Sequence, residues 1–162
     1  MNIALIGLGK MGSNMARRLL RGGIGVVGVD HSPETVATLA KEEGMTPADS
    51  MLHAVQQLHS PRVVWLMIPS GNPTENAIQE LIPMLEEGDI IIDGGNSNYH
   101  DSQRRGALLT RHDIGFVDAG TSGGVWGLDN GYCLMVGGED SSIKTIEPVL
   151  KVLAPGEDRG WA

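Results

Sequence analysis

A glycine-rich turn between an apolar run and an amphipathic segment constrains the fold of this chain more than any other feature. Asn2-Ile3-Ala4-Leu5-Ile6 predicts a buried strand, and Gly7-Leu8-Gly9-Lys10-Met11-Gly12 follows it at once. The amphipathic segment that comes next predicts a helix ending at Gly22-Gly23. With this spacing the first glycine permits a tight turn, the second lets a pyrophosphate approach the backbone, and the third lets helix pack on strand. The pattern predicts a dinucleotide site, and a purely structural glycine turn is the alternative.

An acidic residue ends the next predicted strand, residues 25–29. Asp30 lies close to the offset of about 20 residues at which a carboxylate takes the ribose hydroxyls of NAD. A carboxylate there repels the 2′-phosphate of NADP, and no arginine follows among residues 31–34 to accept that phosphate. We therefore expect NAD, with NADP as the weaker candidate. The alternative is that Asp30 caps the following helix, a role that Ser32 can also fill.

A second glycine-containing turn follows the apolar residues 90–92. The strand is expected to stop at the two glycines of Asp93-Gly94-Gly95-Asn96-Ser97. The next two residues supply a side-chain amide and a hydroxyl. In open α/β sheets, ligands bind just beyond the carboxyl ends of the strands. Glycine lets a backbone come close to a ligand, and asparagine supplies both a donor and an acceptor. We interpret the segment as a ligand site; a simple turn of the same composition is the alternative.

A third glycine-rich segment, residues 119–127, follows the predicted strand 115–118. Successive N–H groups around Gly123 and Gly124 are suited to hold a carboxylate, and Ser122 adds a hydroxyl. The alternative is a wide turn that joins two strands. Because the segment also follows a strand, we favour a site.

Apolar runs and amphipathic segments alternate along the rest of the chain. We expect Pro148 to open a separate last helix, because proline disrupts a helix interior. Arg104 and Arg105 are expected on a solvated helix face, and the alternative is that one of them points toward a phosphate. The alternation predicts an α/β fold, a doubly wound and mostly parallel sheet in one domain, residues 1–162. The remaining predicted strands are 63–68, 89–93, 115–118 and 132–136, and the predicted helices are 34–43, 48–59, 74–86, 99–112 and 140–153.

Composition narrows the class of protein. A formal charge of −8 over 162 residues argues against a nucleic-acid groove or an anionic membrane surface. No apolar run approaches the ~20 residues that span a bilayer. The first residues enter a predicted strand directly, so we expect no signal peptide. The single cysteine, Cys133, indicates a reducing compartment, so we expect a cytoplasmic protein. The five histidines lack metal-ligand spacing, and we expect no metal site.

Four stretches of the sequence resemble the 6-phosphogluconate dehydrogenase family of the β-hydroxyacid dehydrogenase superfamily. Residues 7–12 resemble the superfamily's opening motif, and residues 122–124 its substrate motif. Residues 89–105 resemble the phosphogluconate branch more than the 3-hydroxyisobutyrate branch, and residues 134–138 match the strand after the substrate motif. The resemblance covers essentially the whole chain and implies a Rossmann-type coenzyme domain. Asp30-His31-Ser32 stands where NADP-using members carry an Asn-Arg-Thr type sequence, which implies the NAD-preferring branch.

The resemblance also implies roles for particular residues. The first glycine turn would hold the pyrophosphate, and residues 30–32 the adenosine ribose. Residues 68–70 would line the dinucleotide, and Asn96 would touch both nicotinamide and substrate. The implied coenzyme-binding residues are Gly7, Leu8, Gly9, Lys10, Met11, Gly12, Asp30, His31, Ser32, Ile68, Pro69, Ser70 and Asn96. The implied substrate-binding residues are Asn96, Ser122, Gly123 and Gly124.

The family's chemistry needs parts that these residues lack. The resemblance implies oxidation of 6-phosphogluconate with hydride transfer to NAD, then loss of CO₂ to give ribulose 5-phosphate, a step of gluconate use in the pentose phosphate pathway. The lysine base and glutamate acid lie on a helix after the coenzyme domain, so we expect them beyond Ala162 and expect no catalytic residue in this chain.

We accordingly expect a truncated, inactive coenzyme domain that lacks the family's all-helical domain. That domain also carries the family's homo-oligomer contacts, and Trp126 and Trp161 are expected to cover surfaces that it would bury. The alternatives are the coenzyme domain of another β-hydroxyacid dehydrogenase, or an NAD-binding module without catalysis.

Overall fold

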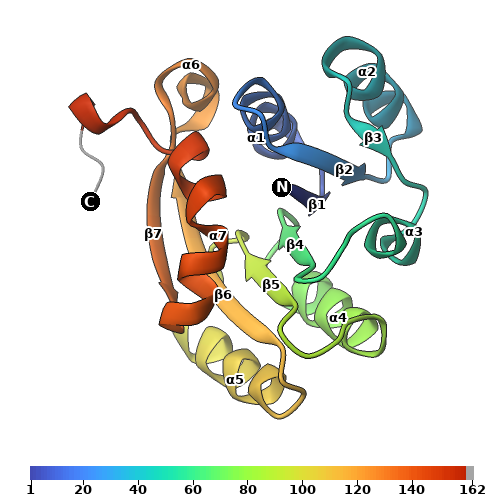
Figure 1. Cartoon of the computed structure of the whole chain (residues 1–162), viewed down its shortest axis with the longest axis vertical. Coiled ribbons are helices and arrows are strands. Elements are labelled where there is room, and N and C mark those ends of the chain that lie inside the picture. The colour runs from blue at the N-terminus through green and yellow to red at the C-terminus, as the bar shows by residue number, and fades with distance from the viewer. Residues whose placement is uncertain (160–162) are drawn as a thin grey trace.

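A seven-stranded sheet forms the centre of the molecule in the computed structural model, which describes residues 1–159 (Figure 1). The strand order is β3-β2-β1-β4-β5-β6-β7. Every neighbouring pair is parallel except β6 and β7, which are antiparallel. The doubly wound, mostly parallel sheet predicted from the sequence is therefore confirmed. The strands are β1 (Asn2–Ile6), β2 (Gly25–Val29), β3 (Thr46–Pro47), β4 (Val63–Leu66), β5 (Ile90–Asp93), β6 (Gly115–Ser122) and β7 (Cys133–Gly138).

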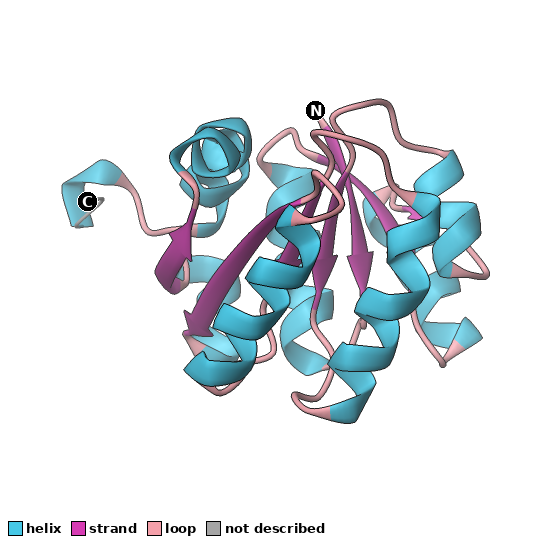
Figure 2. Cartoon of the chain, turned by 90° about the horizontal axis from the view of Figure 1, so that it is seen from below, coloured by secondary structure: helices cyan, strands magenta, loops and turns pink. Residues whose placement is uncertain are grey.

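Helices cover both faces of this sheet, and Figure 2 shows them in front of and behind the strands. One face packs against α1, α2 and α7, and the other against α3, α4 and α5. Helical and 3₁₀ segments are α1 (Lys10–Arg21), α2 (Pro33–Glu43), α3 (Met51–Gln56), α4 (Asn72–Leu81), η1 (Ile82–Met84), α5 (Tyr99–Thr110), η2 (Gly124–Trp126), α6 (Gly127–Asn130), α7 (Asp140–Leu153) and η3 (Glu157–Arg159).

The two-sided cover follows from the apolar strands. Side chains alternate between the faces of a strand, so Ile3 and Leu5 of β1 enter the core under α1 while Ala4 and Ile6 enter the core under α4. All four residues of β4 and all four of β5 are buried, as expected for parallel strands covered on both faces. This burial fixes the carboxyl ends of β1, β4 and β5 beside one another.

Arg18 ties the first helix to the end of the last one. Its Nε donates to the carbonyls of Val152 and Leu153 at 2.8 and 3.1 Å, and its Nη2 to that of Ala154 at 2.8 Å. Nη1 donates to the Leu128 carbonyl of α6 at 3.0 Å. A cation at a helix C-terminus satisfies carbonyls that lack intrahelical partners and complements the helix dipole.

Several predicted elements differ from the observed ones. Pro148 lies inside α7 and does not open a separate helix. Proline has no N–H to donate to the carbonyl of Lys144 four residues before it. Both residues are exposed, so that carbonyl lies on a side of the helix where water can supply the missing hydrogen bond. The short β3 was not predicted, and α3 is shorter than the predicted 48–59. The described residues contain no helix long and apolar enough to cross a membrane.

The third glycine-rich segment is also more regular than predicted. β6 continues through Ser122, because residues 117–122 pair with residues 133–138 of β7. The predicted loop 119–127 is thus the end of a strand followed by η2 and the start of α6. Trp126 is 71% exposed, while Trp161 lies outside the described residues.

Candidate functional site

The predicted ligand loops all lie at one edge of the sheet. Gly7 follows β1, Asp30 follows β2, Pro69 follows β4 by a short loop, and Asn96 follows β5. Ser122 ends β6. Because these five strands are parallel, their carboxyl ends meet at the same edge. The fold therefore brings together segments that lie far apart in the sequence.

The three glycines of the first turn have different surroundings. Gly7 has φ +93°, and an added Cβ would lie 2.3 Å from the Met67 carbonyl oxygen. An added Cβ at Gly12 would lie 2.1 Å from the carbonyl oxygen of Gly7. Gly9 has φ −62°, and its Cβ position meets no atom within 4 Å. The fold itself requires glycine at 7 and 12, but no contact within the chain requires glycine at 9.

The first turn of α1 offers free donors beside this open space. Gly9 is the N-cap and provides no side-chain acceptor, and the first turn of α1 contains no acidic residue. The N–H groups of a first helical turn have no intrahelical partner, and the helix dipole adds partial positive charge there. The turn therefore suits an anion. Lys10 is exposed at the same end, whereas Leu8 is buried.

Asp30 joins this turn to the end of β2. Its Oδ1 accepts the backbone N–H of Leu8 at 2.8 Å, and its Oδ2 accepts the N–H of Ser32 at 2.9 Å. The cap of α2 is Ser32, whose Oγ accepts the N–H of Thr35 at 3.3 Å. The capping role considered for Asp30 thus belongs to Ser32. His31 is exposed between them.

The loop after β4 packs against the turn after β5. An added Cβ at Gly95 would lie 2.5 Å from the Ile68 carbonyl oxygen, and one at Gly94 would lie 2.5 Å from the Met67 sulfur. These two glycines therefore allow close approach between two parts of the chain itself, rather than the ligand approach expected from the sequence. Pro69 and Ser70 are exposed at the resulting edge.

Asn96 adopts a left-handed backbone conformation at the end of this turn. Its φ is +56°, and its side-chain Oδ1 accepts the N–H of Thr121 in β6 at 3.3 Å. Asparagine tolerates this conformation better than most residues. The exposed Asn96 is thereby fixed next to the strand that ends in Ser122.

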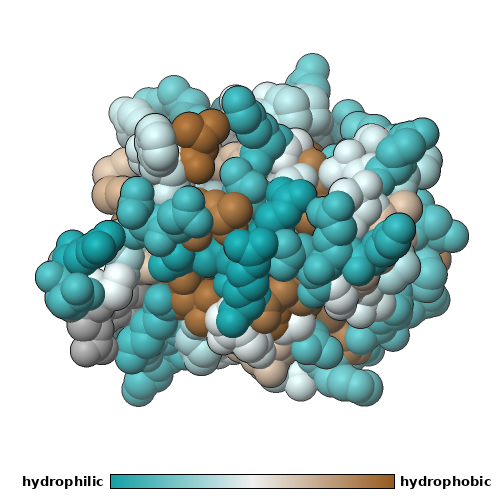
Figure 3. All heavy atoms as spheres, turned by 90° about the horizontal axis from the view of Figure 1, so that it is seen from above, coloured by the Kyte–Doolittle hydropathy of each residue, from teal (hydrophilic) through white to brown (hydrophobic). Residues whose placement is uncertain are grey.

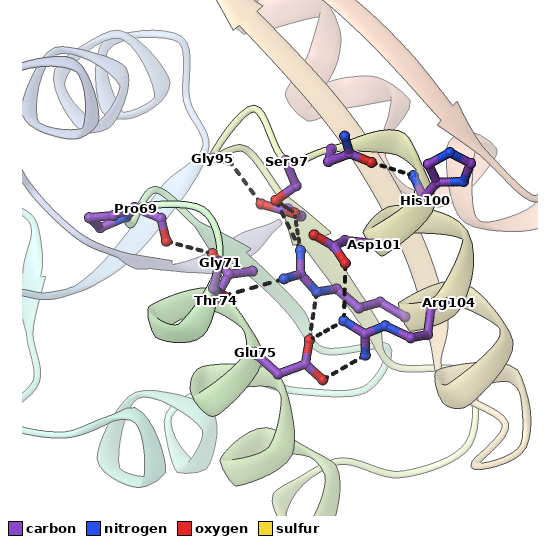
Figure 4. Close-up of polar contacts among 12 residues, drawn as sticks. Pro69, Gly71, Thr74, Glu75, Gly95, Ser97, His100, Asp101 and Arg104 are labelled. Carbon is purple, nitrogen blue, oxygen red and sulfur yellow. Dashed lines mark hydrogen bonds and ion pairs between the residues drawn. The ribbon is translucent and has the colours of Figure 1, made fainter.

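A buried ionic cluster lies beneath these loops, and Figure 4 shows part of it around Glu75, Ser97 and Arg104. Arg105 of α5 is 1% exposed and forms ion pairs with Asp93 at 3.3 Å and Glu75 at 3.0 Å. The expectation of a solvated Arg105 is wrong, because these two carboxylates hold its guanidinium inside. Arg104 is more than half exposed and pairs with Glu75 from the solvent side. The spacing of the sequence gave no signal for this cluster.

Two acids in or near this cluster have shifted pKa values. The hydrogen bond from Arg104 is the largest effect that lowers the pKa of Glu75, to about 2, with Arg105 adding to it against the effect of burial. Burial raises the pKa of Asp118 in β6, and the nearby charge of Asp93 adds to that rise. Glu75 therefore stays ionised at any moderately acidic pH.

The segment after β6 leaves one glycine open to solvent. Gly124 has φ +50°, and its Cβ position meets no atom within 4 Å. An added Cβ at Gly127, in contrast, would lie 2.1 Å from the ring of the buried Tyr132. Ser122 is exposed and pairs across the ladder with Cys133, an exposed free cysteine. Among residues 1–159 no group of three or more acidic, histidine or cysteine side chains is placed to hold a metal ion.

Curated proteins similar to this chain include dehydrogenases. The NAD⁺-dependent decarboxylating 6-phosphogluconate dehydrogenase of Haloferax volcanii is 38% identical over 158 residues, which cover 98% of this chain and 52% of that protein. A Bacillus subtilis protein of the same name is 36% identical, and the chain covers 33% of it. The chain thus spans between a third and about half of these relatives' lengths.

Solved structures agree with this comparison. A Plasmodium falciparum 6-phosphogluconate dehydrogenase, described as apo and in complexes with NADP⁺ and with 6-phosphogluconate, has a TM-score of 0.88 at 30% identity. The match covers 96% of this chain and 34% of that one. The 3-hydroxyisobutyrate dehydrogenase of Mycobacterium tuberculosis has a TM-score of 0.86 at 29% identity, over 96% of this chain and 52% of that one. Residues 2–157 match the family described as the NAD binding domain of 6-phosphogluconate dehydrogenase, and the chain belongs to that family.

Proposed function

We propose that this chain binds NAD along the carboxyl edge of its sheet, with the pyrophosphate at Gly7-Leu8-Gly9-Lys10-Met11-Gly12. Gly9 is the observation that carries the proposal. An added Cβ there would meet no atom within 4 Å, so the backbone at Gly9 lies open beside the first turn of α1. A pyrophosphate can approach the backbone at such a second glycine, and the free N–H groups of α1 would bind it.

The adenosine ribose is assigned to Asp30, His31 and Ser32. Each Asp30 oxygen already accepts one backbone N–H, and a carboxylate oxygen accepts two hydrogen bonds, so both keep a lone pair for a ribose hydroxyl. The negative charge of Asp30 disfavours the 2′-phosphate of NADP. The relative from Haloferax volcanii is named as NAD⁺-dependent, which supports the same preference.

The nicotinamide half and the substrate are assigned to the other end of the edge. Ile68, Pro69 and Ser70 would line the dinucleotide, and Asn96 would contact both nicotinamide and substrate. When bound, the nicotinamide supplies the acceptor for a hydride. The exposed hydroxyl of Ser122 and the N–H groups of Gly123 and Gly124 would hold the sugar acid, because a turn with positive φ can direct successive N–H groups toward an anion.

As part of a longer protein, the chain would serve oxidative decarboxylation of 6-phosphogluconate to ribulose 5-phosphate in the cytoplasm. The base, the acid and the homo-oligomer contacts would come from a helical domain beyond Ala162. Because this proposal assigns these groups to another domain, we expect negligible turnover from the chain alone. A second candidate substrate is an unphosphorylated β-hydroxy acid, which the structural similarity to a 3-hydroxyisobutyrate dehydrogenase favours.

Calorimetric titration of the chain with NAD and, separately, with NADP tests the proposal. Tighter binding of NAD supports both the glycine turn and the role of Asp30, whereas equal or tighter binding of NADP contradicts the ribose assignment. Formation of NADH from 6-phosphogluconate by the purified chain would contradict the assignment of the base and acid to another domain. Titration with 6-phosphogluconate and with 3-hydroxyisobutyrate in the presence of NAD compares the two substrate classes.

A further inference from the structure

Arg105 forms hydrogen bonds to two loops of the candidate site, which a solvent-facing residue of a helix would not do. Its Nη1 donates to Ser97 Oγ at 2.9 Å and to Asp93 Oδ2 at 3.3 Å. Its Nη2 donates to the Gly71 carbonyl at 3.3 Å, and its Nε donates to Glu75 at 3.0 Å. A guanidinium has five N–H donors in a fixed plane, so it bridges several acceptors in one geometry.

These contacts join two of the ligand loops. Gly71 and Glu75 belong to the loop after β4 and the first turn of α4, and Figure 4 shows both beside Thr74, whose Oγ1 donates to the Pro69 carbonyl at 2.9 Å. Asp93 and Ser97 flank the turn after β5. Arg105 therefore sets the separation between the segment 68–70 and the segment 94–97.

The same contacts fix the conformation of Asn96. Asp93 Oδ1 accepts the N–H of Gly95 at 2.9 Å, and the Ser97 hydroxyl donates to Asp93 Oδ2 at 2.6 Å. Asn96 lies between these two anchored residues with φ +56°, and its side chain reaches Thr121. The turn is held from below by Arg105 and from the side by β6.

We propose that Arg105 is a positioning residue that preorganises the nicotinamide half of the coenzyme site and leaves the adenosine half unaffected. This inference rests on the proposed function. The adenosine side, around Gly9 and Asp30, makes no contact with Arg105 among the interactions of the described residues. Preorganisation matters because a site held loosely loses affinity even when all its binding groups are present.

Two ligands separate this role from general stability. ADP probes only the adenosine diphosphate half, and NAD probes both halves. We expect Arg105→Lys to weaken NAD binding about tenfold and to change ADP binding by less than about twofold, because lysine keeps the charge but not the planar fork. Arg104→Lys is the matched control: Arg104 shares Glu75 but its hydrogen bonds do not reach Asp93, Ser97 or Gly71. It should leave both affinities unchanged.

Ser97→Ala removes one acceptor of Arg105 and should likewise weaken NAD binding more than ADP binding. If Arg105→Lys does not fold, the comparison of the two affinities is made with Ser97→Ala. An equal loss of NAD and ADP affinity, or unchanged NAD affinity in the folded variants, overturns the proposal.

Amide hydrogen exchange tests the positioning role without any coenzyme. The N–H of Gly95 is bonded to Asp93 and that of Thr121 to Asn96, so both should exchange faster in Arg105→Lys and not in Arg104→Lys. Unchanged exchange at both amides contradicts the positioning role even if NAD binds. A wild-type chain that binds neither NAD nor ADP contradicts the proposed function instead, and the exchange result then decides the role of Arg105 by itself.

Discussion

The carboxylate of Asp30 accepts the backbone N–H of Leu8 at 2.8 Å, so the acid that ends the second strand holds the glycine turn that follows the first. The two sequence features that predicted a dinucleotide site are thus physically joined. Leu8 is buried, and its N–H would otherwise lack an acceptor in the turn. Asp30 has a structural role in addition to the ribose contact that we propose.

Substitution of Asp30 should therefore affect two separate properties. Asp30→Asn keeps an acceptor for Leu8 but removes the charge, so the ratio of NAD to NADP affinity should fall about tenfold while the fold persists. Asp30→Ala also removes the acceptors of Leu8 and Ser32 and should lower the free energy of unfolding by about 1–3 kcal/mol. Calorimetry and urea unfolding measure the two effects.

Ser50→Ala is the control for Asp30, because Ser50 caps α3 and is not assigned to the coenzyme. It removes that cap at a cost of about 1 kcal/mol, with the coenzyme preference unchanged. If Asp30→Asn retains the full preference for NAD, Asp30 does not face the ribose phosphate position.

Alanine substitutions at two glycines of the first turn should separate an effect on NAD affinity from an effect on the free energy of unfolding. Gly12→Ala places a Cβ against the Gly7 carbonyl, and we expect a loss of about 1–3 kcal/mol in the free energy of unfolding. Gly9→Ala meets no atom of the chain and should cost less than about 1 kcal/mol, yet it should reduce NAD affinity at least about tenfold. Denaturation and titration of both variants check this; normal NAD affinity in Gly9→Ala would remove the main support for the pyrophosphate assignment.

The stability of the chain should decrease in acid in a way that depends on Glu75. Its pKa is about 2 in the folded chain, against about 4.3 for an unfolded glutamate, so the unfolded state binds more protons between these values. The stabilisation by Glu75 is complete above about pH 4.5 and is lost as the pH falls toward about 2. Thermal unfolding of Glu75→Gln should show a shallower acid dependence than wild type; identical slopes in this range would contradict the assignment.

Asp118 should have the opposite pH dependence. Burial and the charge of Asp93 raise its pKa, so the folded state binds its proton more tightly than the unfolded state does. Stability from this group is present at low pH and is lost as the pH rises through its folded pKa. Asp118→Asn should raise the Tm at neutral pH by about 2 °C, and the gain should shrink in acid. Calorimetric scans across pH test this, and a gain that does not vary with pH points to a cause other than the charge.

The local signals in the sequence predicted most of the fold. Strand β1, helix α1 and the first two glycine segments each carry a pattern that depends on near neighbours, and these elements were predicted near their observed positions. The end of β6 was missed because its pairing with β7 is a tertiary contact, and nothing within residues 119–122 shows it. Pro148 was misread because local propensity ignores that the lost helical bond lies on an exposed face.

The candidate site was predicted as a set of loops without the residues that hold them together. Gly94 and Gly95 were recognised as a site feature, but their space is taken by the loop after β4, which only the folded arrangement reveals. Arg105 was misplaced for the same reason. Two adjacent arginines on a polar helix look equivalent in sequence, yet the partners Asp93 and Glu75 come from β5 and α4 and bury just one of them.

Arg18 makes helix α1 a mechanical link between two distant parts of the molecule. Gly9 is the N-cap of α1. Arg18, near the C-terminal end of α1, donates hydrogen bonds to the last carbonyls of α7 and to that of its C-cap Ala154. An axial shift of one end of a rigid helix displaces the other end by the same amount. A force on the backbone beyond Ala154 would therefore reach the first glycine turn through α1, with the Arg18 guanidinium as one of the contacts that transmit it.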